Sequence, residues 1–209
     1  MRNNVTETQF KESLVEVRKA YRLLYLYQKR VRDLVIFIKD KWNLKLEAGM
    51  PWPLYHDTGN TKGKHVNIKH SPWVWLPMYY YDFFFLRKNE DGSTSIQVGI
   101  IIQSDTGFFD VSSEFKKPNI NQFAPPEESE TRIILAASNG NWDSEAIRKD
   151  KSFGKNKFVY PDNNKTIKDV KIIAKAYPLV NFFNEDSTEQ TLKDFEEFCE
   201  SKGIPNLKS

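Results

Sequence analysis

Hydrophobic residues near the start of the chain recur at intervals that alternate between four and three residues. They are Phe10, Leu14, Val17, Tyr21, Leu24, Val31, Val35, Ile38 and Trp42, with Gln28 at the one polar position of the series. A heptad repeat of this kind aligns its apolar side chains along one seam of an α-helix. The pattern therefore predicts a long N-terminal helix within residues 1–48, running to about Asn43.

The residues before this seam carry a helix start signal. Thr6 and Gln9 have the spacing of a capping box, in which each side chain accepts a hydrogen bond from the other residue's backbone N–H. Val5 and Phe10 have the spacing of a hydrophobic staple, which fixes the entry of the chain into the helix. We therefore expect the helix to begin directly after Thr6.

The second half of this helix is apolar outside the seam as well. The residues concerned are Leu23, Leu26, Ile36 and Phe37. A helix that is apolar on several faces is covered on several faces. Two explanations remain open: the helix lies in the core of a monomer, or it packs on the sheet with one face and on a partner helix with another. In the second case these four residues and Gln28 form the interface, and Gln28 fixes the register.

Short runs of aromatic and β-branched residues after this helix predict a mainly antiparallel sheet of about five strands. The expected strands are residues 73–86, 95–102, 108–111, 131–137 and 170–177. Asp91-Gly92 predicts a hairpin turn between the first two of them. A second turn is expected at Asp105-Thr106-Gly107, because these residue types favour tight turns.

A C-terminal helix is expected at residues 186–203. Ser187 and Gln190 have the spacing of a capping box at its start. Gly203 is placed to end it, because glycine adopts the left-handed backbone conformation that commonly follows the last helical turn.

The order of helix, strands and helix predicts an α+β fold with the C-terminal helix packed on the sheet. We expect one domain over residues 1–209. Its parts are the long N-terminal helix in residues 1–48, the sheet region with long loops in residues 71–180 and the C-terminal helix in residues 186–203.

Composition limits the possible functions. A chain of 209 residues can bury one substantial core. The net charge of +3 does not require a nucleic-acid or membrane partner. Cys199 is the only cysteine, which excludes an internal disulfide and a cysteine-based zinc site. No apolar run has the length of a signal peptide or membrane helix. We therefore expect a soluble cytoplasmic protein without a membrane partner.

All three histidines, His56, His65 and His70, fall in one expected loop at residues 49–70. Imidazoles gathered in one segment could bind a metal. Their spacing matches no zinc pattern, and a metal site also needs groups that orient its ligands. We expect a solvated loop with weak or absent metal binding, and no cofactor.

Glu114-Phe115-Lys116 provides a carboxylate and a lysine two residues apart, with Asp82 and Asp110 as possible upstream acids. This spacing resembles the metal-dependent nucleases of the PD-(D/E)xK type. The resemblance implies a divalent metal held by carboxylates and a lysine that orients the attacking water. It covers three residues, and the position of neither acid matches the expected neighbouring strand.

Residues 148–175 are rich in lysine with aromatic residues between them. Within this segment Lys151, Lys155 and Lys157 are the candidate contacts to nucleic-acid phosphates, next to aromatic residues that could stack on bases. Acidic residues dilute the segment, and the acidic C-terminal helix could pair with it in the same molecule or between two molecules. A solvated basic face is the simpler explanation.

These observations favour a non-enzymatic protein that works by association. The expected partner is the protein itself or another protein subunit, giving a homo-oligomer or an accessory subunit of a larger complex. A divergent metal-dependent nuclease using Glu114 and Lys116 is one alternative. A nucleic-acid-binding module using the lysine-rich segment is the other.

Overall fold

The computed structural model describes residues 6–51, 80–107, 121, 123–140, 163–167, 170–204 and 207. The chain forms two compact units, residues 1–41 and residues 42–209. The first contains helix α1, Glu7–Lys41. The second contains the sheet and the C-terminal helix.

Helix α1 begins as the sequence predicts. The backbone N–H of Thr6 donates to Gln9 Oε1 at 2.9 Å, and the N–H of Gln9 donates to Thr6 Oγ1 at 3.2 Å. These two bonds confirm the capping box. Val5, the other half of the expected staple, lies outside the described residues.

The end of α1 differs from the expectation. The helix stops at Lys41 rather than near Asn43, and residues 45–48 belong to a strand. Asn43 has a φ of 47°, in the left-handed region where a right-handed helix ends. Trp42 therefore lies beyond the helix, although the heptad spacing includes it.

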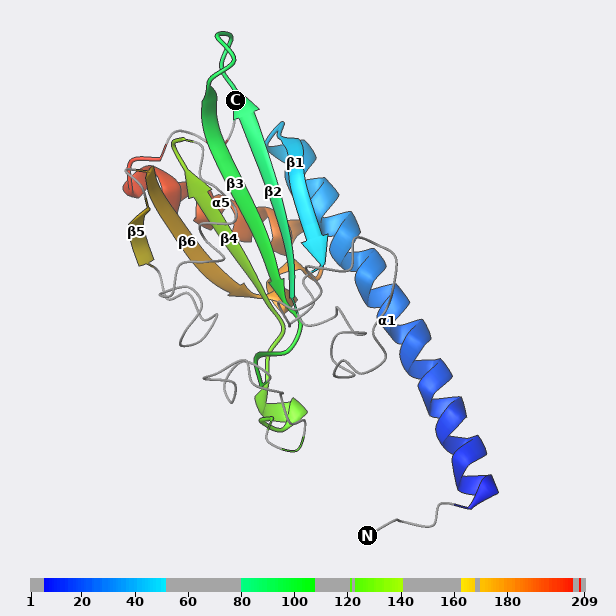
Figure 1. The fold of residues 1–209 in the computed structure, drawn as a ribbon. Helices are drawn as coiled ribbons and strands as arrows, with labels where there is room; N and C mark the ends of the chain where they lie inside the picture. The colour runs from blue at the N-terminus through cyan, green and yellow to red at the C-terminus, as the bar shows by residue number, and fades with distance from the viewer. Residues whose placement is uncertain are drawn as a thin grey trace. The chain divides into compact units, whose positions relative to one another are not determined.

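The second unit contains a six-stranded sheet in the order β1-β2-β3-β4-β6-β5, and every neighbouring pair is antiparallel (Figure 1). The strands are β1 Lys45–Pro51, β2 Tyr80–Lys88, β3 Thr94–Gln103, β4 Arg132–Ser138, β5 Asn163–Ile167 and β6 Val170–Pro178. With α1 and the C-terminal helix, this sheet confirms the α+β fold.

Four of the expected strands correspond to β2, β3, β4 and β6, and the expected strand at residues 108–111 lies outside the described residues. The sequence did not predict β1 and β5. Both are edge strands. Their sequences, Lys-Leu-Glu-Ala-Gly-Met-Pro and Asn-Asn-Lys-Thr-Ile, contain few of the residues that signal a strand. Proline within a sheet is confined mainly to edges, which agrees with the position of Pro51.

The turn between β2 and β3 forms where it was predicted. Gly92 has a φ of 82°, which glycine adopts without strain. Asp91 Oδ1 accepts a hydrogen bond from the Ser93 N–H at 2.8 Å. The turn holds the register that pairs Phe85 with Val98.

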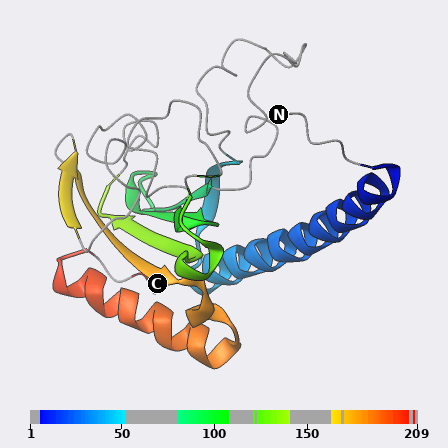
Figure 2. The same ribbon diagram turned by 90° about the horizontal axis from the view of Figure 1, so that it is seen from below.

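The central strands are buried on both faces: every residue from Ile96 to Gln103 in β3 is buried. Helix α5, Glu185–Ser201, covers one of these faces (Figures 1 and 2). Lys175 and Tyr177 of β6 contact α5 from that face.

The ends of α5 show one correction and one confirmed prediction. Asn184, not Ser187, is the N-cap: its side chain accepts from the Ser187 N–H, and the Ser187 hydroxyl accepts from the Asn184 N–H. The helix therefore starts at Glu185. At the other end Gly203 has a φ of 73°, and the N–H of Ile204 donates to the Cys199 carbonyl at 3.0 Å. This is the Schellman arrangement expected for Gly203.

Trp42, at the start of the second unit, packs against α5. Its side chain is fully buried, its ring centroid lies 5.9 Å from that of Phe195, and its Nε1–H donates to Glu196 Oε1 at 2.8 Å. The Glu196 carboxylate is itself buried. A buried carboxylate is costly without a hydrogen-bond partner, so the indole both fills the core and stabilises the charge beside it.

Asp194 forms a second polar contact between α5 and the sheet. Its Oδ2 accepts from Lys175 Nζ at 2.7 Å and from Tyr177 Oη at 2.6 Å. Partial burial opposes ionisation of Asp194, but the hydrogen bonds from Lys175 and Tyr177 outweigh it and lower the pKa of the carboxyl. Lys175 thus pairs with the acidic helix in the same molecule.

We expect the Asp194→Asn variant to lose about 1 kcal/mol of unfolding free energy at neutral pH, the low end for a charged hydrogen bond because Asp194 is half exposed. A carboxyl with a lowered folded pKa stabilises the fold above its unfolded pKa and loses this contribution as pH falls. The difference between wild type and variant should therefore shrink between about pH 5 and pH 3, measured by urea unfolding. As control, Glu197→Gln removes an exposed pair with Lys193 and should change little at any pH. A pH-independent loss in Asp194→Asn would contradict the assignment.

Candidate functional site

Most exposed large hydrophobic side chains in the described residues lie on α1. They are Phe10, Leu14, Val15, Val17, Tyr21, Leu23, Tyr25, Leu26 and Ile36, and those elsewhere are Leu46, Val180 and Phe183. Single exposed apolar residues are normal on a protein surface, but a continuous set marks an interaction site. We therefore treat α1 as the candidate functional site.

The heptad seam of α1 has two parts with different exposure. Every residue from Glu7 to Leu23 is exposed, including 58% of Phe10 and 64% of Tyr21. The buried residues of α1 are Val31, Leu34, Val35 and Ile38, all in its last three turns. We call Phe10, Leu14, Val17, Tyr21 and the half-buried Leu24 the N-terminal seam.

The interface predicted from the sequence includes exposed residues of the same helix. Leu23, Leu26 and Ile36 are 68%, 60% and 45% exposed, Gln28 is also exposed, and Phe37 is half-buried. The apolar surface that motivated the prediction is therefore present, and the interface stays a prediction. The N-terminal seam was not included in it. Its signal was present in the sequence, since a narrow seam with polar flanks is typical of paired helices.

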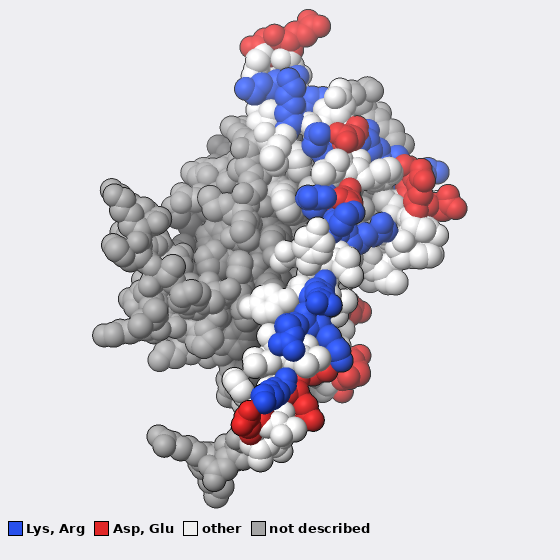
Figure 3. Space-filling model, turned by 90° about the vertical axis from the view of Figure 1, so that its right-hand side faces the viewer, with Lys and Arg blue, Asp and Glu red and all other residues white. Residues whose placement is uncertain are grey.

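Four cationic residues of α1 lie along one edge of its heptad seam. Lys11, Arg18, Arg32 and Lys39 occupy the position that directly follows a seam residue, at multiples of seven residues from one another. Figure 3 shows Lys and Arg side chains distributed along α1. The opposite edge holds the uncharged residues Ser13, Ala20, Tyr27 and Leu34, followed by Lys41 at the end of the helix. The two edges of the seam therefore differ in charge.

Ion pairs within α1 are exposed and local. Examples are Lys11–Glu7 at 2.6 Å, Lys19–Glu16 at 2.8 Å and Lys29–Asp33 at 2.7 Å. Such surface pairs contribute little to stability, because solvent and salt screen them. Arg18 forms no ion pair with any residue that the structure describes. The guanidinium next to the middle of the N-terminal seam is thus available to a partner.

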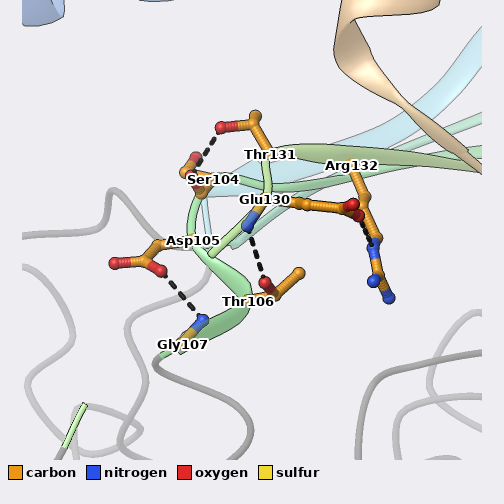
Figure 4. Close-up of polar contacts among 7 residues, drawn as sticks. All are labelled: Ser104, Asp105, Thr106, Gly107, Glu130, Thr131 and Arg132. Atoms are coloured by element: carbon orange, nitrogen blue, oxygen red, sulfur yellow. Dashed lines mark hydrogen bonds and ion pairs between the residues drawn. The ribbon is translucent and has the colours of Figure 1, made fainter. Parts of the chain in front are cut away.

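The end of β3 lies beside the start of β4, and the residues at this point form a polar cluster (Figure 4). The members are Ser104, Asp105, Thr106, Gly107, Glu130, Thr131 and Arg132. The Thr106 N–H donates to the Glu130 carbonyl at 3.0 Å, and the Glu130 N–H donates to Thr106 Oγ1 at 2.9 Å. A Cβ on Gly107 would lie 2.3 Å from Ser129 Oγ, so a larger residue here would require the Ser129 side chain to move. Thr106 and Gly107 are helical, whereas the sequence predicted a tight turn at Asp105–Gly107.

The carboxylates of this cluster do not converge on one point. Asp105 Oδ1 accepts from the Gly107 N–H at 2.9 Å, whereas Glu130 Oε2 pairs with Arg132 Nε at 2.8 Å, and Figure 4 shows the two side chains pointing apart. Within the described part of the chain, no group of His, Cys, Asp and Glu is arranged to hold a metal. We therefore assign the cluster a structural role at the strand ends.

The residues that would carry the alternative functions are mostly outside the described part of the chain. Asp82 pairs with Ile101 in the sheet, but its side chain is not described. The other candidates outside the described residues are Asp110, Glu114 and Lys116 for a nuclease, His56, His65 and His70 for a metal, and Lys151, Lys155 and Lys157 for nucleic acid. These assignments stay predictions.

Cys199, the remaining nucleophile of interest, is fully buried on α5. Burial, together with the nearby charges of Glu196 and Glu200, raises the pKa of its thiol. Because the thiolate is the reactive form, this residue has the properties of a structural cysteine.

The fold is thus α+β, with a six-stranded antiparallel sheet and a long amphipathic helix that is exposed over its first half. Among the described helices, none combines the length and apolar character required to cross a bilayer. The chain belongs to the PM0109 family, whose family model matches residues 7–206. No curated protein and no solved structure matches the chain. The description of the family states no activity, so the functional argument rests on α1.

Proposed function

We propose that the protein acts by association, as an interaction or accessory subunit whose helix α1 binds a helix of a partner. The observation that carries the proposal is the exposed N-terminal seam. Isolated helices gain little stability from propensity alone, and most helices in proteins are stabilised by packing of an apolar face. Every residue from Glu7 to Leu23 is exposed. A partner would provide the packing that this half of α1 lacks.

A helix is the partner element that suits this surface. The seam residues alternate at four and three positions, which is the spacing that lets side chains of one helix fit between those of another. Ser13 and Ala20 on one edge are small and allow close approach. Leu23 and Leu26 lie on a different face of α1 and extend the surface available to an assembly.

The size of the N-terminal seam limits the affinity of this association. Each of the five side chains of the N-terminal seam has only part of its surface left to bury. Burying that part would contribute on the order of 5 kcal/mol to the free energy of binding. Association costs about 4–15 kcal/mol in lost freedom of motion. The seam alone would therefore give weak binding, and contacts along its edges must contribute to a stable complex.

The proposal can be tested with two neighbouring residues of similar exposure, Leu14 at 38% and Val15 at 41%. Leu14 is on the N-terminal seam, whereas Val15 points about 100° away around the helix. We expect Leu14→Asp to abolish association of the full chain, with itself or with synthetic leucine-seam helices, in sedimentation and fluorescence anisotropy. Val15→Asp should leave it unchanged. Wild-type chain that stays monomeric and binds none of these helices would contradict the proposal.

A further inference from the structure

The two edges of the N-terminal seam restrict which helix can pair with it. In paired helices, residues at the seam edges contact the edge residues of the partner and set its identity and orientation. One edge of the α1 seam carries Lys11 and Arg18, and the other carries Ser13 and Ala20. Arg18 has no ion-pair partner among the described residues. A partner with negative charge at its seam edge would supply one.

A second copy of α1 does not provide this charge. In an antiparallel pair the cationic edges of the two copies would face each other, which is repulsive. In a parallel pair each cationic edge would face the uncharged edge, with Ser13 or Ala20 opposite Lys11 or Arg18 of the other copy. Neither arrangement gives the cations an ion pair.

A lipid surface also fits less well. A helix that lies in a membrane interface carries its apolar residues on one face and its charges on the other. On α1, Leu23 and Leu26 are exposed 68% and 60% on faces away from the N-terminal seam. The acidic residues Glu12 and Glu16 also lie in the exposed half. The apolar surface is thus divided, as expected for contacts with separate protein elements.

We infer that the partner of α1 is a helix of a different protein whose apolar seam is bordered by Asp or Glu. This inference rests on the function proposed above. The seam supplies an apolar contact that many helices could make, and the acidic border determines which helix binds. Charge arrangements of this kind set specificity and association rate more than raw affinity.

Two synthetic peptides of about four heptads test this inference. Both have leucine along the seam; one has Glu at every edge position and the other has Lys, so that neither pairs with itself. We expect the full chain to bind the Glu-bordered peptide at least about tenfold more tightly, a difference of about 1.4 kcal/mol. The preference should largely disappear in about 1 M salt, where exposed charges are screened.

Charge-reversed variants provide the matched control. Lys11→Glu combined with Arg18→Glu should reverse the preference and favour the Lys-bordered peptide. Lys19→Glu combined with Arg30→Glu makes the same change in net charge on the far side of the helix. This second variant should keep the preference for the Glu-bordered peptide. Circular dichroism of each variant checks that α1 remains helical.

The outcomes separate this inference from the proposed function. If both peptides bound equally well and Leu14→Asp abolished this binding, the inference of an acidic partner would be wrong. The proposal that α1 binds a helix would still stand. Self-association without peptide binding would assign the seam to a second copy. Binding to equimolar phosphatidylcholine–phosphatidylserine vesicles without peptide binding would assign it to lipid. No binding of any kind would overturn both proposals.

Discussion

Replacing Trp42 with alanine should lower the free energy of unfolding by about 3–5 kcal/mol, the range for emptying a buried aromatic site. The ring is fully buried against Phe195. The change also removes the N–H that donates to Glu196 at 2.8 Å and leaves a buried carboxylate without this bond. Urea unfolding followed by far-ultraviolet circular dichroism measures the loss.

Two further variants separate packing from hydrogen bonding at this site. Trp42→Phe retains an aromatic ring but has no N–H, so we expect a loss of about 1–3 kcal/mol from the missing hydrogen bond to the Glu196 carboxylate, plus a smaller packing term. Combining it with Glu196→Gln should recover part of that loss, because a neutral amide is less costly to bury than a charge. Wild-type stability in Trp42→Ala would show that the indole is not in the core.

Phe84→Ala should cause a loss in the same range, about 3–5 kcal/mol. Phe84 is 1% exposed in β2 and pairs with Gly99 of β3, which in turn pairs with Ala136 of β4. Cross-strand partners share one face of a sheet. Truncation would therefore leave a row of three small residues, with no neighbouring side chain in that row large enough to fill the space.

Phe183 provides the matched control for Phe84, because it is 67% exposed. Phe183→Ala should change the free energy of unfolding by less than about 0.5 kcal/mol, as for other surface positions. Thermal unfolding of the two variants side by side gives the comparison. Equal effects would mean that Phe84 is not part of the buried core.

The sequence predicted the elements whose residues have a clear period or a defined end signal. The heptads of α1, the Asp91-Gly92 turn and the Gly203 stop all depend on contacts between residues close in the chain. The edge strand β1 could not be predicted in this way, since its partner residues, such as Phe84, lie far away in the sequence. Strand β5 pairs with the neighbouring β6, but its sequence Asn-Asn-Lys-Thr-Ile contains few residues that signal a strand. Trp42 fits the heptad spacing by number, but the helix ends at Lys41, next to the left-handed backbone of Asn43.

The candidate site was predicted only in part. The spacing of Phe10, Leu14, Val17 and Tyr21 defines the seam, but spacing cannot distinguish a seam buried by the same chain from one that is exposed. That distinction depends on tertiary packing. The apolar residues outside the seam, such as Leu23 and Leu26, predicted an interface in the second half of α1, whereas the exposed seam begins in its first turn.

The composition of the edge strands bears on the tendency of the sheet to add further strands. An exposed edge can add strands from other molecules and lead to fibrils, and proteins prevent this with short edge strands, lysine and proline. Strand β1 begins with Lys45 and ends with Pro51, and β5 has only five residues with Lys165 at its centre. Strand addition at either border is therefore discouraged. Growth of an assembly by strand addition is thus disfavoured at both borders of the described sheet, which agrees with the association through α1 that we propose.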